Sequence, residues 1–316
     1  MRDRTALGEP LAAVVDPKVA ARSLGKPLRA WSLAVSFLGD CIVPRGGDVG
    51  LGTLAEALAA LGVEPGVTRT AMSRLAGDGW VRRRKVGRSS FYSLTPKALA
   101  ESEAASRCIY AARHPVDPCG WRVYLGGGLV RAEQRRLRTA LHRRGAAELS
   151  AHVYILPAGE DRPSAEPVIA LTADPLPEAE ARALVERAFD LGEVASAYAE
   201  FLGAFAPVGA ALGAGAKLFG LEAVAMRVLL IHAFRRIVLR DPMIPAPYLP
   251  EGWPGIAARE TAVAIWRALF LCSEAWLDAN AASAEGPLPP RSNSSPRFES
   301  GCDWAPIDGV VSATGP

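Results

Sequence analysis

The sequence has few of the residues that metal centres and disulfide frameworks require. Its five cysteines are scattered and odd in number, and no two of them have the spacing of a zinc-binding pair. The four histidines do not cluster in the sequence either. We therefore predict reduced thiols and no metal site, a pattern that is typical of a cytosolic protein.

Long apolar runs are also missing. The longest apolar stretch, Leu221–Phe234, is interrupted by Glu222 and Arg227 and is too short to span a bilayer. No apolar segment follows Arg2 and Arg4, so we expect no signal peptide. Together these absences predict a cytoplasmic protein that has no membrane partner.

The motifs of common enzyme classes are absent as well. No Gly-x-Gly-x-x-Gly or P-loop pattern follows a strand-like run, and no nucleophile elbow occurs. The glycine- and alanine-rich stretch 203–216 lies between predicted helices, and we interpret it as a linker rather than as a phosphate-binding loop. We therefore predict no catalytic residues and a protein that is not an enzyme.

Charge is distributed unevenly along a chain whose formal net charge is only +3. The segment Val67–Lys97 holds eight Arg or Lys and a single acid, whereas Ala158–Glu200 holds ten acids and three Arg. Hydrophobic residues make up 50% of the chain, which is enough for globular cores and excludes a wholly disordered protein. The dense basic block indicates an anionic partner, with nucleic acid as the leading candidate.

The basic block falls within a series of short predicted elements. Apolar spacing predicts a helix from Pro27 that stops at Gly39, a short extended piece at Cys41–Pro44, a second helix over Leu51–Leu61 and a third from Pro65. Two strand-like runs around a glycine turn then predict a basic hairpin. Three helices followed by a hairpin is the order of a winged helix-turn-helix domain.

In the third helix, Val67, Ala71, Met72 and Leu75 are predicted to face the core, which leaves short polar and Arg side chains outside. Such a helix fits the major groove of DNA, where base edges present donors and acceptors. The hairpin arginines, with no acids near them in the sequence, would contact phosphates or the minor groove. The predicted DNA-binding residues are Thr68, Arg69, Thr70, Ser73 and Arg74 on the helix, and Arg82, Arg83, Arg84, Lys85 and Arg88 on the hairpin.

Four segments resemble the PaaX family of bacterial transcriptional repressors: VSFLGDCIVPRGGD (35–48), VTRTAMSRLAGDGW (67–80), GRSSFYSL (87–94) and FRRIVLRDPMIPAPYLPEGWPG (234–255). They stand in order across most of the chain, roughly residues 28 to 280. The resemblance implies a repressor of a phenylacetate-type catabolic operon that binds an inverted-repeat operator as a homodimer. It also implies release from DNA by an aryl-acetyl-coenzyme A effector such as phenylacetyl-coenzyme A, with no bound cofactor.

The middle of the chain predicts a ferredoxin-like domain from its order of elements: a strand near 121–125, a helix near 130–144, two strands near 152–156 and 167–172, and a helix from about 177. In the resembling family this domain is similar to the Cas2 nuclease fold. The Arg-rich helix 130–144 faces either solvent or a DNA backbone, and the sequence leaves both open. The domain as a whole is a candidate for dimer contact or for relaying a signal.

A nuclease activity is nevertheless not expected. Cas2-type nucleases place an aspartate at the end of the first strand to hold a metal ion. This chain has Leu125 followed by three glycines there, so no carboxylate supplies the hard oxygen ligands that such an ion needs.

The C-terminal part predicts helices near 191–205, 217–239 and 256–281, with a proline-rich strap after Asp241. Arginines here would hold the phosphates of an acyl-coenzyme A effector against apolar walls. The predicted effector-binding residues are His232, Arg235, Arg236 and Arg240. The alternative is that these arginines and Asp241 form a structural ion-pair and capping network around the strap.

The sequence thus predicts an α+β multidomain protein that regulates transcription. The expected parts are a flexible arm (1–26), a winged helix-turn-helix DNA-binding domain (27–112), a ferredoxin-like, Cas2-like domain (119–192), an α-helical effector and dimerisation domain (193–283) and a disordered tail (284–316). Two other functions remain open at this stage. They are a coenzyme A thioester enzyme using Asp241 or His232, and an RNA-binding protein.

Overall fold

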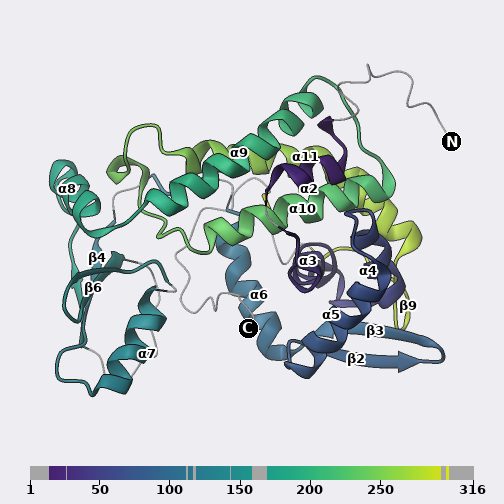
Figure 1. Ribbon diagram of the computed structural model, residues 1–316, viewed down its shortest axis with the longest axis horizontal. Helices are drawn as coiled ribbons and strands as arrows, with labels where there is room; N and C mark the ends of the chain where they lie inside the picture. The colour runs from purple at the N-terminus through teal and green to yellow at the C-terminus, as the bar shows by residue number, and fades with distance from the viewer. Residues whose placement is uncertain are drawn as a thin grey trace. The chain divides into compact units, whose positions relative to one another are not determined.

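The computed structural model describes residues 14–25, 27–111, 113–116, 119–142, 144–158, 169–292 and 297–298. They form an α+β protein of long helices and small antiparallel sheets (Figure 1), which confirms the predicted class. The chain divides into two compact units, each assembled from segments that are far apart in the sequence. Unit 1 takes the described residues of Met1–Glu103, Glu200–Phe234 and Glu260–Phe298, and unit 2 those of Ala104–Ala199 and Arg235–Arg259.

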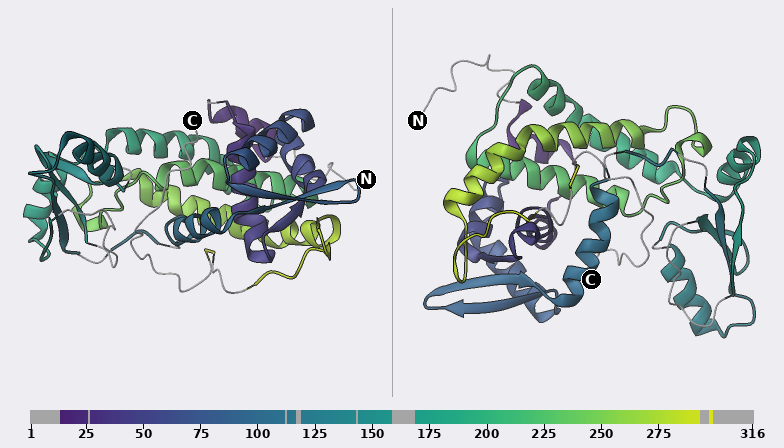
Figure 2. Two further views of the ribbon diagram at one scale, coloured as in Figure 1. Left: turned by 90° about the horizontal axis from the view of Figure 1, so that it is seen from below. Right: turned by 180° about the vertical axis from the view of Figure 1, so that it is seen from behind.

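The first part of unit 1 is a group of short helices beside a small sheet. Its helices are α2 (Pro17–Ser23), α3 (Ala30–Phe37), α4 (Leu51–Ala59) and α5 (Pro65–Gly77), and its strands are β1 (Asp48–Gly50), β2 (Val81–Val86) and β3 (Ser89–Leu94). The helices α3, α4 and α5 pack against one another, and their buried side chains include Phe37, Leu58 and Met72. The strands run antiparallel in the order β1–β3–β2, and Figure 2 shows β2 and β3 as a hairpin that projects from these helices.

Two expectations for this region are wrong. Helix α2 lies in the segment expected to be an irregular arm, where the Asp16 carboxylate caps the helix by accepting a hydrogen bond from Lys18 N at 2.7 Å. The first thirteen residues of that arm lie outside the described residues. The segment expected to be extended is instead a π-helix (Leu38–Ile42) followed by a 3-10 turn (Val43–Arg45). Gly46, with φ 88°, ends this helical run, whereas Gly39 does not.

Long helices complete both units. They are α6 (Pro96–Ile109), α9 (Gly192–Gly213), α10 (Gly220–Val238) and α11 (Pro254–Asn280), and the boundaries between the units fall inside them. Within unit 1, every residue from Ala223 to Phe234 of α10 is buried. Phe201 of α9 packs on Phe234, with ring centroids 5.5 Å apart. These helices therefore form the centre of the unit 1 core.

The glycine-rich linker expected at 203–216 is largely helical. Phe205, Val208 and Ala211 of α9 are buried at helical spacing, so tertiary packing outweighs the low helix propensity of the glycines. A Cβ atom at Gly209 would lie 3.5 Å from Ile265, which shows how closely α9 approaches α11. In the described part of the chain, α9 is the one helix long and apolar enough to cross a membrane, although a core helix of a soluble protein passes the same test.

Unit 2 contains a four-stranded antiparallel sheet. Its elements are β4 (Trp121–Leu125), α7 (Arg131–His142), β5 (Ala147–Ser150), β6 (Val153–Pro157), β7 (Ile169–Ala173), α8 (Glu178–Ala188) and the 3-10 turn η3 (Ala246–Tyr248). The strand order is β5–β6–β4–β7. Leu137 and Leu141 of α7 pack on Tyr124 and Tyr154 of the sheet. The sequence missed β5, which has only four residues.

The sheet order agrees with a ferredoxin-like arrangement, but the chain order differs from it. A ferredoxin-like chain places its second helix between the third and fourth strands, whereas α8 follows the fourth strand, β7. Residues 159–168, which connect β6 to β7, lie outside the described residues.

The start of the segment expected to be a disordered tail has a defined structure. Strands β8 (Ala282–Ser283) and β9 (Gly286–Pro287) form a short hairpin in unit 1, and Leu288 and Phe298 are buried. The remaining tail, residues 293–296 and 299–316, lies outside the described residues.

Candidate nucleic-acid interface

Helix α5 presents a polar face to solvent and buries Met72 and Leu75 as predicted, but Thr68 takes the core position that was assigned to Val67. Pro65 occupies its first turn, and Thr68, Met72 and Leu75 are buried at the spacing i, i+4, i+7. Thr68 is 0% exposed, whereas Val67, which was assigned to the core, is 51% exposed. The prediction that Thr68 contacts DNA is therefore wrong, because its side chain points into the core.

The other four predicted residues of α5 are exposed together. Arg69, Thr70, Ser73 and Arg74 share the side of the helix that faces away from the core. The Thr70 hydroxyl donates to the Gly66 carbonyl at 3.0 Å and keeps its lone pairs available as acceptors. Arg74 and Asp78, both exposed, lie 3.9 Å apart, and such a surface pair costs little to break. This face can donate and accept hydrogen bonds along one groove.

The β2–β3 hairpin carries the second group of basic residues. Arg82 and Arg84 lie on one face of β2, while Arg83 and Lys85 lie on the other. The Arg83 guanidinium donates to Ser90 Oγ from Nε and Nη2, at 3.1 and 2.9 Å. Arg82, Lys85 and Arg88 are exposed, and no ion pair joins them to another described residue. Their positive charges are therefore available to an anionic partner.

Arg84 differs from the other hairpin arginines, because two acids lie beside it. Its Nη2 is 3.3 Å from Asp48 on β1, and its Nη1 is 3.4 Å from Glu285 in the β8–β9 hairpin. The Ala284 amide also donates to Asp48 at 2.8 Å. The expectation that no acid offsets the hairpin charge is thus wrong for Arg84. Glu285 is 201 residues away in the chain, so local sequence carries no signal for it.

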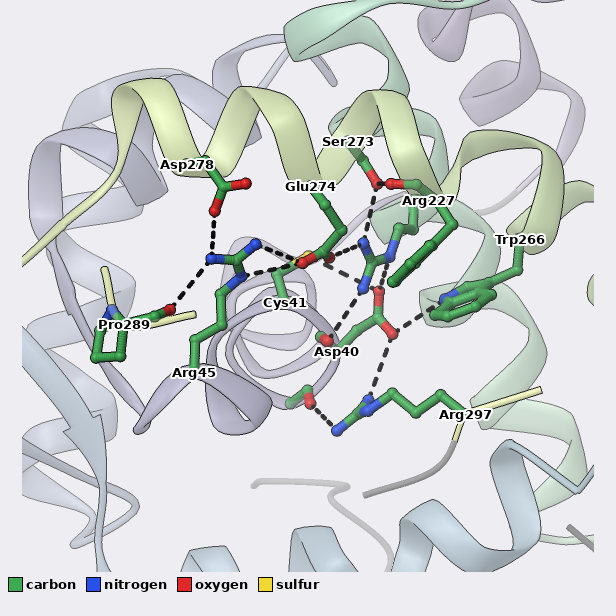
Figure 3. A network of polar contacts seen from close by, with 12 residues as sticks. Asp40, Cys41, Arg45, Arg227, Trp266, Ser273, Glu274, Asp278, Pro289 and Arg297 are labelled. Carbon is green, nitrogen blue, oxygen red and sulfur yellow. Dashed lines mark hydrogen bonds and ion pairs between the residues drawn. The ribbon is translucent and has the colours of Figure 1, made fainter. Parts of the chain in front are cut away.

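Beneath these surface elements lies a buried ion-pair network centred on Asp40 of the π-helix (Figure 3). The Asp40 carboxylate accepts hydrogen bonds from Arg227 Nε at 2.6 Å, Trp266 Nε1 at 3.2 Å and Arg297 Nη1 at 3.4 Å. Asp40 and Arg227 are both fully buried. A buried charge needs such partners, because its desolvation costs several kcal/mol.

The network continues through Glu274 of α11. Arg227 Nη1 donates to the Glu274 carboxylate and, at 2.9 Å, to Ser273 Oγ. Arg45, in the turn before β1, donates to Glu274 at 2.6 Å and to Asp278 at 2.7 Å. Within unit 1 the network therefore ties the segment that leads into the sheet to α10 and α11 (Figure 3).

The charges of the network shift the pKa values of the groups inside it. Burial alone would lower the pKa of the Arg227 guanidinium, yet the negative groups around it, Asp40 first, raise that pKa above its usual value. Burial also raises the pKa of the Cys41 thiol, so this thiol stays protonated and unreactive. Arg227 therefore remains a permanent cation that holds two carboxylates in place.

The four predicted effector-binding residues lie on α10 or just after it, but their environments differ. His232, in unit 1, is buried, and its Nδ1 lies 3.4 Å from Ser32 Oγ. Arg235, in unit 2, is also buried, and burial together with the nearby charge of Arg236 lowers its pKa to about 10. Arg236 and Arg240 are exposed, and Arg240 Nε donates to the Arg236 carbonyl at 2.8 Å. Of the four predicted effector-binding residues, only Arg236 and Arg240 are exposed to solvent.

Asp241 has a structural role in unit 2. Its carboxylate accepts hydrogen bonds from the Tyr198 hydroxyl at 2.7 Å and from the Met243 amide at 2.8 Å. Burial, followed by the charge of Asp241, raises the pKa of Tyr198 well above its usual value. Met243 has φ 53°, so Asp241 stabilises a strained turn at the start of the proline-rich strap. Among the described residues, no group of three or more His, Cys, Asp or Glu side chains could hold a metal ion.

Comparisons with known proteins place these features in a wider context. A family model described as PaaX-like protein matches residues 29–98, and one described as PaaX-like protein C-terminal domain matches residues 189–279. The transcriptional repressor PaaX of Escherichia coli (strain K12) is 32% identical over 276 residues, which cover 83% of this chain and 87% of that protein. A solved structure of the uncharacterized protein Rv0674 from Mycobacterium tuberculosis is 24% identical and covers 70% of this chain and 90% of its own, with a TM-score of 0.46.

Proposed function

The chain belongs to the PaaX family of transcription regulators, and we propose that it represses an aromatic catabolic operon by binding an inverted-repeat operator as a homodimer. The relative in Escherichia coli is a transcriptional repressor, so this chain is a DNA-binding regulator and not an enzyme. The operator, the dimer and the effector belong to the proposal, as does a cytoplasmic location.

One observation carries the proposed mode of DNA binding. The exposed face of α5, with Arg69, Thr70, Ser73 and Arg74, belongs to the same compact unit as the basic β2–β3 hairpin. In this proposal the N-terminal part of unit 1 is a winged helix-turn-helix domain. Helix α5 reads base edges in the major groove. Three hairpin side chains contact phosphates or the minor groove: Arg82, Lys85 and Arg88.

A strand at the edge of the unit 2 sheet supports the proposed homodimer. Ile169 and Leu171 of β7 are 63% and 51% exposed, and they share one face of that strand. An exposed apolar edge strand is a template for pairing with another chain. A second copy of the unit 2 sheet would cover β7 and give the two α5 helices the two-fold relation that an inverted repeat requires.

The proposed effector is an acyl-coenzyme A such as phenylacetyl-coenzyme A. Support comes from Arg236 and Arg240, which are both exposed, lie four residues apart in the sequence and carry guanidinium groups that suit phosphates. Effector binding would release the operator only if the thioester binds the DNA-free protein more tightly than it binds the DNA-bound protein. The buried His232 is not available for this contact without a rearrangement.

A gel-shift assay on the upstream region of the chain's own gene tests the proposal, with acyl-coenzyme A thioesters titrated into the complex. We expect the protein to bind this DNA sequence-specifically, and we expect one thioester to release the protein from the DNA. The Arg74→Ala variant should lose about 1–3 kcal/mol of operator affinity with relaxed specificity, while Arg187→Ala, an exposed arginine of unit 2, serves as the matched control. Equal loss on all DNA sequences would make Arg74 a phosphate contact.

Two other results would change the proposal. Specific binding that no thioester affects would keep the regulator and remove the effector. Equal affinity for single-stranded RNA, with no preference among duplex sequences at moderate salt, would overturn DNA repression in favour of an RNA-binding protein.

A further inference from the structure

Helix α7 of unit 2 has a strongly basic side that the proposed operator contacts do not use. Arg131, Arg135 and Arg136 are all exposed on the side of α7 opposite Leu137 and Leu141, which are buried against the sheet. These three arginines define the basic face of α7. None of them forms an ion pair with another described residue.

The few acids near α7 leave the basic face uncompensated. The Glu133 carboxylate accepts a hydrogen bond from the Val130 amide at 3.2 Å, so it is held at the N-terminus of the helix. Glu148 on β5 lies 3.3 Å from Arg138 Nε, at the edge of the face, and 4.0 Å from His142. Neither acid forms an ion pair with any of the three arginines.

The arrangement has an energetic cost in the free protein. Arg131 and Arg135 are four residues apart on a helix, and like charges at that spacing destabilise it by about 0.2–0.5 kcal/mol. An anionic partner that binds the basic face of α7 would reduce this repulsion.

We propose that the basic face of α7 binds the phosphate backbone of duplex DNA, as a second contact surface outside α5 and the β2–β3 hairpin. The inference rests on the proposed function, because it assumes that this chain binds an operator. From Arg131 to Arg136 the helix rises about 7.5 Å, which matches about two base-pair steps of a duplex. Arginine forks suit phosphate oxygens.

A membrane surface fits the same face less well. A helix that lies in a membrane interface needs an exposed apolar side, and the apolar side of α7 is occupied by the sheet of unit 2. Base reading is not part of the proposal, because phosphate contacts position a protein without carrying sequence information.

The test compares a triple variant, Arg131→Gln, Arg135→Gln and Arg136→Gln, with the matched triple Lys variant, which keeps the charge. Glutamine and lysine resemble arginine in helix propensity, so both variants should keep α7 folded, as circular dichroism and thermal melting can verify. Operator affinity is measured for all three proteins between 50 and 200 mM salt.

Each phosphate contact contributes about 0.9 to the slope of log K against log salt, so the Gln variant should lose about 2.7 from that slope. Its disadvantage relative to the wild type should therefore shrink about 40-fold between 50 and 200 mM salt. The Lys variant should keep the wild-type slope.

Unchanged slope and affinity in the Gln variant, with specific wild-type binding intact, would overturn the α7 proposal alone. A wild-type protein with no operator preference would instead overturn the proposed function. Vesicles containing phosphatidylserine form a further arm. Wild-type binding to them that the Gln variant loses, with no change in the DNA slope, would assign the face to a membrane and overturn the DNA proposal.

Discussion

Replacing Asp40 by asparagine removes one negative charge from the buried ion-pair network while changing the side-chain shape very little. Asp40 accepts hydrogen bonds from Arg227, Trp266 and Arg297, and all of these partners are donors. An asparagine keeps one acceptor oxygen but turns an NH₂ group toward donors. The Asp40→Asn variant therefore leaves a buried guanidinium with less charge compensation and with a donor facing a donor.

The size of the effect follows from the remaining partners. Removing one member of a buried ion pair costs about 3–5 kcal/mol. Arg227 keeps Glu274 and Ser273, and Arg297 keeps the Gly39 carbonyl, so we expect the lower end of this range, about 3 kcal/mol. Urea denaturation followed by tryptophan fluorescence and circular dichroism should show a midpoint that falls by roughly 1 M.

A double-mutant cycle and a control isolate the interaction. Arg227→Met removes the cation, so the double variant Asp40→Asn/Arg227→Met should cost less than the sum of the single variants, with a coupling of about 1 kcal/mol or more. Asp78→Asn is the control, because Asp78 is an exposed acid beside Arg74 and its loss should cost under about 0.5 kcal/mol. If Asp40→Asn behaves like Asp78→Asn, or if the cycle is additive, the network does not stabilise unit 1 as argued.

Three further predictions concern single side chains. Thr68 Oγ is buried without a hydrogen-bond partner among the described residues, so Thr68→Val should raise the free energy of unfolding by about 1 kcal/mol and leave operator affinity unchanged; a drop in affinity would return Thr68 to the interface. Burial lowers the pKa of His114 below 6.5, so its stabilising contribution is present above pH 6.5 and is lost as pH falls through the lowered folded-state pKa. The urea midpoint of the wild type should therefore fall more between pH 7 and pH 5 than that of His114→Gln, and equal falls would contradict the assignment. Because Asp48 and Glu285 lie beside Arg84, Arg84→Ala should reduce the salt dependence of DNA binding less than Arg82→Ala, which parallel titrations on one operator would check.

Local elements were predictable where a local pattern determines them. The strand Trp121–Leu125 has the predicted bounds, and the β2–β3 hairpin forms as predicted around a glycine turn, because alternation and a glycine turn are properties of neighbouring residues. Met72 and Leu75 of α5 are buried as predicted, but Thr68 rather than Val67 is the core residue of the first turn. That choice depends on how α5 packs against α3 and α4.

Features that depend on contacts between distant residues could not be predicted from the sequence. Asp40 and Arg227 are 187 residues apart, and each looked like an isolated charge in an apolar pattern. Arg84 likewise finds Glu285 across 201 residues. The second half of α9 was interpreted as a linker because of its glycines, although a Cβ atom at Gly209 would contact Ile265 of α11. Such contacts form because the folded core brings distant residues together, and local helix propensity does not indicate them.

The split of unit 1 over three chain segments has a consequence for biosynthesis. The α5 helix and the β2–β3 hairpin belong to the first segment of unit 1 to be synthesised, which ends at Glu103. The last segment of unit 1 ends only at Phe298. At 5–20 residues per second, that interval lasts roughly 10–40 s. During it Asp40 and Arg45 lack the partners that Arg227 and Glu274 later supply, so a chain that terminates early leaves these charges unpaired. The buried ion-pair network of unit 1 is therefore complete only in chains that are translated through α11.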